Sequence, residues 1–267
     1  SGGGRWAGGR SVTVRRGPVT VIGRAGNRAL VAAIAVDAEL AVQRVTAVWG
    51  STWSGRVVID VPMSVREAAT LVGPAVDLLN VAAVETALST GPPGGPSYGD
   101  RVVVNPATFA RLSGLGRRVV LTHEVMHVAS RQATGPDVPI WLVEGLADYV
   151  AYLGAALPVV EVASELASDV AAGQLPTRLP RDADFRAADP NVAQAYEQSW
   201  LAVRLLATRY GTGAVLDLYR RLGAYRGAPN GQALDAVLRS RLRTSRADFV
   251  RSWLRALRDL PRNRELA

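Results

Sequence analysis

The sequence contains no cysteine and no lysine, and it has only two histidines among 267 residues. Without cysteine, disulfides and thiolate metal ligands are excluded, so any bound metal must be held by histidine and carboxylate side chains. No run of about 18 uncharged apolar residues occurs, so no segment is expected to span a membrane. All 31 basic residues are arginine, and with abundant Ala, Val and Gly this composition is typical of a GC-rich bacterial genome.

Basic residues outnumber acidic ones, which leaves a formal net charge of +8. Such a charge favours anionic partners, such as a cell envelope or a nucleic acid. The arginines are nevertheless spread along the chain in short clusters, and no nucleic-acid recognition motif accompanies them. We therefore expect no nucleic-acid partner, while the oligomeric state stays open.

The chain begins at Ser1 with a Gly-rich stretch and no Met, as a trimmed or mature form would. A signal or anchor removed from this end would make the protein secreted or attached to the cell envelope. That is the localisation we expect.

Hydrophobic content of 48% and charged content of 20% are typical of a globular protein. We expect a flexible or extended lead-in over residues 1–18, an α/β lobe over residues 19–152 and a helical lobe over residues 153–267. Alternating and turn patterns predict strands over 11–22 (interrupted by a turn at Gly17-Pro18), 56–61, 81–88 and 101–105. Helical periodicity predicts helices over 29–48, from Ser64 with Glu67 in a capping box, and over 117–131, 141–149, 159–172, 191–210, 213–222, 231–242 and 245–260. Loops are predicted at 91–99 and 173–190.

Both histidines lie in one pentapeptide, His123-Glu124-Val125-Met126-His127, inside the predicted helix over 117–131. Residues four apart on an α-helix share one face, so both imidazoles can point at a single ion. Zinc accepts neutral histidine nitrogen at about 2.0–2.1 Å. Glu124 projects at a different angle, which suits a general base that takes a proton from a zinc-bound water.

A second segment, WLVEGLADY over 141–149, contains Glu144. Glu144 can supply a third zinc ligand from the next helix, which leaves a fourth position for water, as catalytic zinc sites require. We therefore expect one zinc ion per chain, held by His123, His127 and Glu144. Asp148 lies four residues after Glu144 and is the candidate to accept a hydrogen bond from a metal-bound histidine. The alternative is that Asp148 is an ordinary solvated helix residue.

The motifs HEVMH and WLVEGLADY resemble those of the gluzincin zinc metallopeptidases, especially the bacterial peptidase MA-like family, in which HExxH is followed by W-x-x-E-G-x-A. The likeness is specific at these two motifs and diffuse elsewhere over residues 19–260. It implies an α+β fold of the thermolysin-like zincin type. In that fold a mixed α/β lobe precedes a mainly helical lobe, and the active site lies between them.

The resemblance implies further site residues. In this family the strand before the HExxH helix can pair with an extended substrate, which would make Val103 and Asn105 substrate-binding residues. Related enzymes support the oxyanion with a Tyr or His, and Tyr196 is the candidate because it lies in the helix that matches the family's Tyr-containing helix. Tyr149 and Tyr152 are the alternatives. The strand carries VVVNP in place of the GAMEN-type motif of M1 aminopeptidases, which favours an endopeptidase acting on peptide or protein substrates.

Other functions stay open. One is a catalytically silent zincin-fold protein that serves as a binding module or scaffold, although a structural role would not need the base Glu124. A second is an aminopeptidase, and a third is a basic module that binds an envelope or a nucleic acid. A Ser-His-Asp hydrolase is disfavoured because both histidines share one predicted helix, with Val125 between them.

Overall fold

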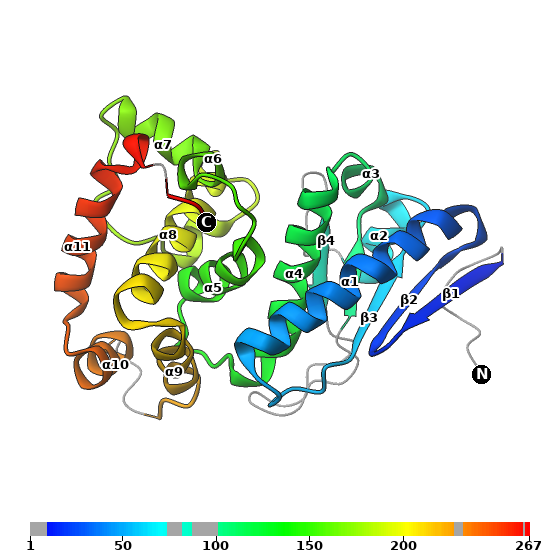
Figure 1. The fold of residues 1–267 in the computed structure, drawn as a ribbon, viewed down its shortest axis with the longest axis horizontal. Helices are drawn as coiled ribbons and strands as arrows, with labels where there is room; N and C mark the ends of the chain where they lie inside the picture. Colours follow the sequence, from blue (N-terminus) through cyan, green and yellow to red (C-terminus); the bar gives the residue numbers. More distant parts are fainter. Residues whose placement is uncertain (1–9, 74–81, 87–100, 227–231, 264) are drawn as a thin grey trace. The chain divides into compact units, whose positions relative to one another are not determined.

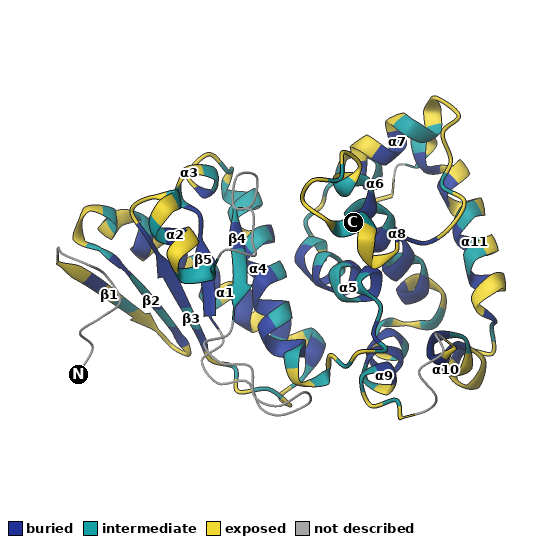
Figure 2. Cartoon of the chain, turned by 180° about the vertical axis from the view of Figure 1, so that it is seen from behind, coloured by how far each residue is buried: buried dark blue, intermediate teal, exposed yellow. Residues whose placement is uncertain are grey.

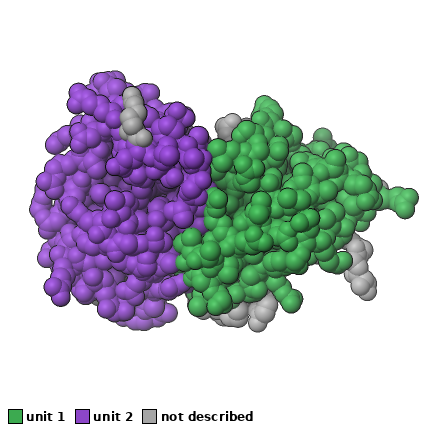
Figure 3. All heavy atoms as spheres, in the orientation of Figure 1, with its two compact units in different colours: residues 1–132 green, residues 133–267 purple. Residues whose placement is uncertain are grey.

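The computed structural model describes residues 10–73, 82–86, 101–226, 232–263 and 265–267. The chain divides into two compact units, residues 1–132 and residues 133–267, coloured separately in Figure 3. The predicted boundary after residue 152 differs from this division, because helix α5 (Ile140–Tyr152) packs against α8 (Val192–Tyr210) of the second unit. The predicted loop over 91–99 lies outside the described residues.

The first unit contains a mixed five-stranded sheet in the order β1-β2-β3-β5-β4. The strands are β1 (Ser11–Arg16), β2 (Val19–Arg24), β3 (Val57–Val61), β4 (Ala83–Thr86) and β5 (Arg101–Val104). β1 and β2 form the predicted hairpin, with Gly17 in the left-handed region at φ 50°. Residues 11–16 of the predicted lead-in are extended and pair with β2. β2, β3 and β5 run parallel, and β4 returns antiparallel to β5.

One face of this sheet is covered by α1 (Arg28–Trp49) and α4 (Gly114–Ser130), which lie side by side in Figure 1. Gly23 of β2 faces α1, because a Cβ at Gly23 would lie 2.5 Å from a methyl carbon of Val31. The register continues this face through Val61, Ile59 and Val102, since side chains of neighbouring paired residues point the same way. Dark blue in Figure 2 marks these buried positions along the strands and along α1 and α4.

The opposite face is covered by α2 (Val65–Val72), whose Ala68 forms a buried apolar cluster with Val103 of β5. Ser64 caps this helix as predicted and accepts a hydrogen bond from the Glu67 amide at 3.2 Å. The other half of the predicted capping box is corrected. The Glu67 carboxylate accepts from the Met63 amide (2.9 Å) and pairs with Arg24 (3.0 Å).

A short connection leads from the sheet to α4. Pro106 ends β5, as predicted, and is also the first residue of the short helix α3 (Pro106–Phe109), where its missing N–H has no cost. Asn105 caps α3 by accepting a hydrogen bond from the Ala107 amide at 3.1 Å. α4 then starts at Gly114, earlier than the predicted residue 117, because Ser113 supplies the cap.

The second unit is helical, and α8 is its central element. α8 packs against α5, α7 (Ser164–Ala171), α9 (Thr212–Gly223), α11 (Arg246–Arg258) and the 3-10 helix η3 (Asp182–Phe185). The predicted helix over 159–172 is divided into α6 (Val159–Val162) and α7, because Ala163 leaves the helical region at φ −115°, ψ 52°. Among the described residues, no helix is both long and apolar enough to cross a bilayer.

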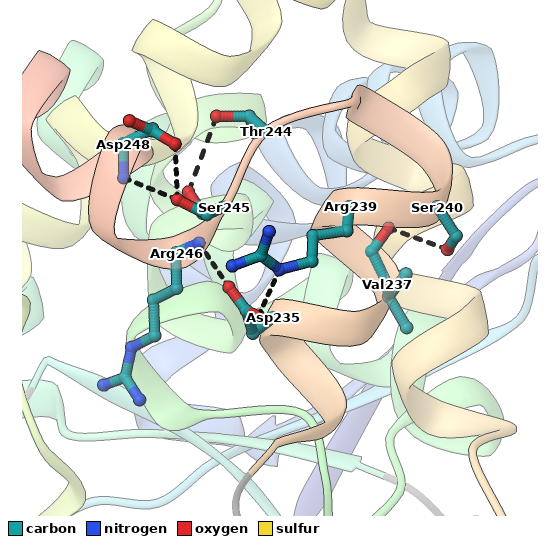
Figure 4. A network of polar contacts seen from close by, with 8 residues as sticks. All are labelled: Asp235, Val237, Arg239, Ser240, Thr244, Ser245, Arg246 and Asp248. Atoms are coloured by element: carbon teal, nitrogen blue, oxygen red, sulfur yellow. Dashed lines mark hydrogen bonds and ion pairs between the residues drawn. The ribbon is translucent and has the colours of Figure 1, made fainter.

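Polar contacts form the corner between α10 (Ala233–Leu242) and α11, as Figure 4 shows. Asp235 accepts hydrogen bonds from the Arg239 guanidinium (2.6 Å) and from the Arg246 amide (2.7 Å). Ser245 caps α11 by accepting from the Asp248 amide at 3.0 Å. These hydrogen bonds stabilise the corner where α10 ends and α11 begins, without a long loop between the two helices.

Candidate metal centre

α4 carries both histidines on one face. The Nε2 atoms of His123 and His127 lie 2.9 Å apart, and the rings meet edge to face with centroids 4.6 Å apart. Two nitrogens bound to a tetrahedral zinc ion at 2.0–2.1 Å would be roughly 3.3 Å apart. The helix therefore holds the two imidazoles within a few tenths of an ångström of the separation that one zinc ion requires.

The packing of α4 fixes the direction of this pair. Val125, between the two histidines, is fully buried, and so is Leu121 one turn earlier. The helix cannot rotate about its axis without exposing these side chains to water, which costs about 1.5–3 kcal/mol for each. Arg131, just after the end of α4, also forms an ion pair with Glu85 of β4. Apolar burial and this ion pair together hold the histidines in one orientation.

Glu124 is placed as its sequence position requires, next to His123 but turned into the protein. It is only 8% exposed. A carboxylate so far removed from water needs polar or charged partners, because desolvation penalises its charge. Its burial beside the histidine pair is compatible with the predicted role as a base.

Glu144 completes a set of three possible ligands. His123, His127 and Glu144 each offer one ligand atom, and these atoms lie within 4.8 Å of one another. Among the described residues, no other group of three His, Cys, Asp or Glu side chains meets this condition. Two imidazoles and one carboxylate are the donor set of a catalytic zinc site with an open fourth position. The residues present therefore fit a zinc ion.

Gly145 explains how the segment that contains Glu144 packs. A Cβ at Gly145 would lie 2.4 Å from the backbone oxygen of Ser199 and 2.8 Å from a methyl carbon of Val203. Only glycine allows α5 and α8 to approach this closely. The motif thus places Glu144, a possible ligand, next to Gly145, which allows α5 to pack closely against α8.

Replacing Gly145 with Ala is expected to destabilise the second unit by about 1–3 kcal/mol, the usual range for inserting a methyl group into a filled interface. Chemical denaturation followed by circular dichroism measures this change. Gly213→Ala in α9 is the matched control, because nothing lies within 4 Å of a Cβ at that position. The control should be neutral or stabilising by up to about 1 kcal/mol. Equal stability of Gly145→Ala and the wild type would contradict the close-contact explanation.

The three candidate tyrosines have different surroundings. The Tyr149 hydroxyl forms a 2.9 Å hydrogen bond with Thr212 Oγ1 at the start of α9. Tyr152 packs on Trp200, and burial, followed by the charges of Asp148, Glu197 and Glu165, raises its pKa to about 12. Tyr196 is half-buried in α8, with its ring edge-on to Phe185 at 5.3 Å. Each of the three tyrosines thus has a packing or hydrogen-bond partner, and the oxyanion role of Tyr196 stays a prediction.

The sheet corrects the expected substrate-binding strand. Val103 pairs with Asp60 of β3 on one side and with Val84 of β4 on the other, so β5 has no free edge there. The backbone N–H of Asn105 donates a hydrogen bond to the backbone oxygen of Ala82 at 2.8 Å, and the side chain of Asn105 caps α3. Val103 and Asn105 therefore serve the fold, and β4 is the last described strand at this side of the sheet. The sequence carries no signal for this order, because strand pairing is not encoded locally.

The second unit contains a pair of carboxyl groups that no sequence pattern predicts, Glu165 at the start of α7 and Glu197 in α8. They are far apart along the chain, and no motif links them. The structure brings the two side chains into contact.

Comparison with known proteins gives only distant likenesses. No family model matches the chain, and no curated protein matches it either. One similar solved structure is a two-domain M1 zinc metallopeptidase mutant bound to L-arginine, with 17% identity, a TM-score of 0.45, and coverage of 97% of this chain and 52% of that chain. Another is a two-domain M1 zinc metallopeptidase mutant bound to L-tryptophan, with 20% identity, a TM-score of 0.41, and coverage of 92% and 51%. The chain thus spans about half the length of these structures, and likenesses at this level carry no functional argument.

Proposed function

We propose that this chain is a zinc-dependent metallopeptidase of the gluzincin type. One observation carries the proposal. The histidine pair of HExxH and Glu144 present three ligand atoms within 4.8 Å of one another, in a chain that has no other histidine and no cysteine. We extend the proposal to the bacterial peptidase MA-like family and its thermolysin-like architecture, because the HEVMH and WLVEGLADY motifs support it. A secreted or envelope-attached location is part of the same proposal.

His123, His127 and Glu144 would hold the metal. When bound, zinc lowers the pKa of a water molecule and polarises the substrate carbonyl. Glu124, buried beside His123, would accept a proton from the attacking water and pass it to the leaving amine. Tyr196 would donate a hydrogen bond to the developing oxyanion. Asp148, one turn after Glu144, would accept a hydrogen bond from one of the two histidines and so fix the ring orientation.

Internal cleavage is the form of activity that we propose, because the chain carries no motif that would hold a substrate α-amino group. The zinc-loaded protein should hydrolyse fluorogenic peptides that are blocked at both ends, drawn from a library of mixed sequence. A chelator should remove the activity, and added zinc should restore it. Cleavage of only those peptides with a free amino terminus would instead indicate an aminopeptidase.

A binding or scaffold protein of the same fold predicts a different outcome. It would bind zinc and peptides but cleave none of the library under metal-replete conditions. A peptide retained on the immobilised protein without turnover, at one zinc per chain, would favour that alternative and contradict the peptidase proposal.

A further inference from the structure

The first turn of α7 is held by a side chain from another helix. α7 has no side-chain cap of its own, since Ala163 occupies the capping position. The Glu197 carboxyl of α8 accepts hydrogen bonds from the Leu166 amide at 2.7 Å and from the Glu165 amide at 3.3 Å. Amides at a helix start need such acceptors, because they have no partner within the helix. Glu197 therefore fastens the start of α7 to α8.

The carboxyl of Glu165 is hydrogen-bonded to the carboxyl of Glu197 as well. An ionised carboxylate has only acceptor atoms, so two carboxyl groups can share a hydrogen bond only when one of them carries a proton. Ser164 Oγ donates a further hydrogen bond to the Glu165 carboxyl at 2.8 Å. All of these hydrogen bonds can therefore form together when the two carboxyl groups share one proton.

We propose that Glu165 and Glu197 form a pH-sensitive latch, in which a single shared proton keeps the start of α7 closed on α8. Loss of that proton to water or buffer breaks the hydrogen bond between the carboxyl groups. It then leaves two adjacent negative charges, one of them half-buried. The charges repel, and Glu197 regains hydration only when α7 opens.

The groups around Glu197 do not offset its negative charge. From α5 the facing group is Tyr152, on which the charge of Asp148 also acts, and from α7 the facing groups are Glu165 and the two capped amides. Burial and the hydrogen bond from Glu165 raise the pKa of Glu197 to about 8, against the opposing effect of the two amides. Tyr152, whose pKa is raised to about 12, stays neutral through this range.

Charged groups on the other neighbouring elements have their own partners or lie in water. Arg204, two turns after Glu197 on α8, pairs with Glu265. Asp184 of η3 forms two hydrogen bonds with Arg178. Arg262 of η4 (Leu260–Arg262), which packs on α7, is exposed. None of these three arginines therefore stabilises an ionised Glu197.

The sign of the pH dependence follows from linkage. The pKa of Glu197 is raised in the closed state and returns towards its ordinary value when α7 opens, so the closed state binds more protons. The opening equilibrium constant should consequently rise with pH, by at most about tenfold per pH unit, and level off above pH 8. The lowered pKa of Glu165 acts in the opposite direction only in acid, as its carboxylate becomes protonated.

Hydrogen exchange of the full chain, resolved at individual amides and corrected for intrinsic rates, tests the latch. Between pH 6 and pH 8, the protection of the Leu166 amide should fall at least tenfold, while amides in the middle of α8 should change little. Glu197→Gln should abolish the fall, because a glutamine amide can accept from Leu166 and donate to Glu165 without a proton. Glu161→Gln, at an exposed position of α6, is the matched control and should behave as the wild type.

A second variant keeps the test decisive if Glu197→Gln does not fold. Glu165→Gln lets the new amide donate to an ionised Glu197, which should weaken the pH dependence in the same way. Protection of Leu166 that is constant from pH 6 to pH 8 in the wild type would overturn the latch. An equal fall in the wild type and in a folded Gln variant would overturn it too. The measurement needs neither metal nor substrate, so its outcome is independent of the proposed peptidase activity.

Discussion

Replacement of Glu124 by Gln should lower kcat/KM for peptide hydrolysis by about 10²–10⁴-fold, the usual contribution of a positioned general base. Glutamine has almost the same shape but cannot accept the proton of the attacking water. Because Glu124 is not among the three possible ligands, zinc content should be unchanged. Steady-state kinetics on a blocked fluorogenic peptide, together with metal analysis of the same sample, measures both quantities.

Glu161→Gln, an exposed change of the same type, is the control and should retain wild-type kinetics. A pH profile adds a second readout. The wild type should lose activity in acid as its base becomes protonated, whereas the residual activity of Glu124→Gln should lack that limb. Full activity of Glu124→Gln at normal zinc content would remove Glu124 from the mechanism and return the role of base to another residue.

Loss of a ligand should have an even broader effect, because it removes the metal as well as the activity. His123→Ala or Glu144→Ala should weaken zinc binding by more than 100-fold, since even outer hydrogen-bond partners of zinc ligands contribute about 10–100-fold. The wild type should hold about one zinc per chain. Inductively coupled plasma mass spectrometry after dialysis against a weak chelator gives the stoichiometry.

The composition leaves few side chains that could replace a lost metal ligand in this test. The chain has two histidines and no cysteine, so no third imidazole and no thiolate can substitute for a lost ligand. Glu161→Gln again serves as the control, because it removes one carboxylate outside the ligand group. A wild type that binds no zinc under metal-replete conditions would contradict the site assignment. Full zinc retention in Glu144→Ala would assign the third ligand to another side chain.

Local patterns predicted most of the secondary structure. The α1 and α8 helices follow their hydrophobic periodicity to within a residue or two at each end, and Ser64 caps α2 as expected. The exceptions have local physical causes that composition alone does not reveal. The Ser113 cap extends α4 towards its N-terminus, and Ala163 interrupts the predicted helix over 159–172.

The histidine spacing could be predicted because it depends on one helix only. The order of strands could not, since β4 pairs beside β5 through contacts that no short segment encodes. Val103 and Asn105 were consequently assigned to substrate binding, although the first lies in the interior of the sheet and the second caps α3. The histidine spacing depends on contacts within one helix, whereas the strand order depends on contacts between residues that are far apart in the sequence.

By itself, the sequence determined the chemistry that this protein can support. The absence of cysteine and the HExxH pentapeptide limit the nitrogen and sulfur donors to two imidazoles on one helix and leave carboxylates as the other possible ligands, because ligand type and helical spacing are local properties. Only the tertiary structure decided which strand lies in the interior, why Gly145 must be glycine and that Glu165 meets Glu197. Each of these depends on surfaces that are distant in the chain and come together only when apolar burial drives the helices and strands into contact.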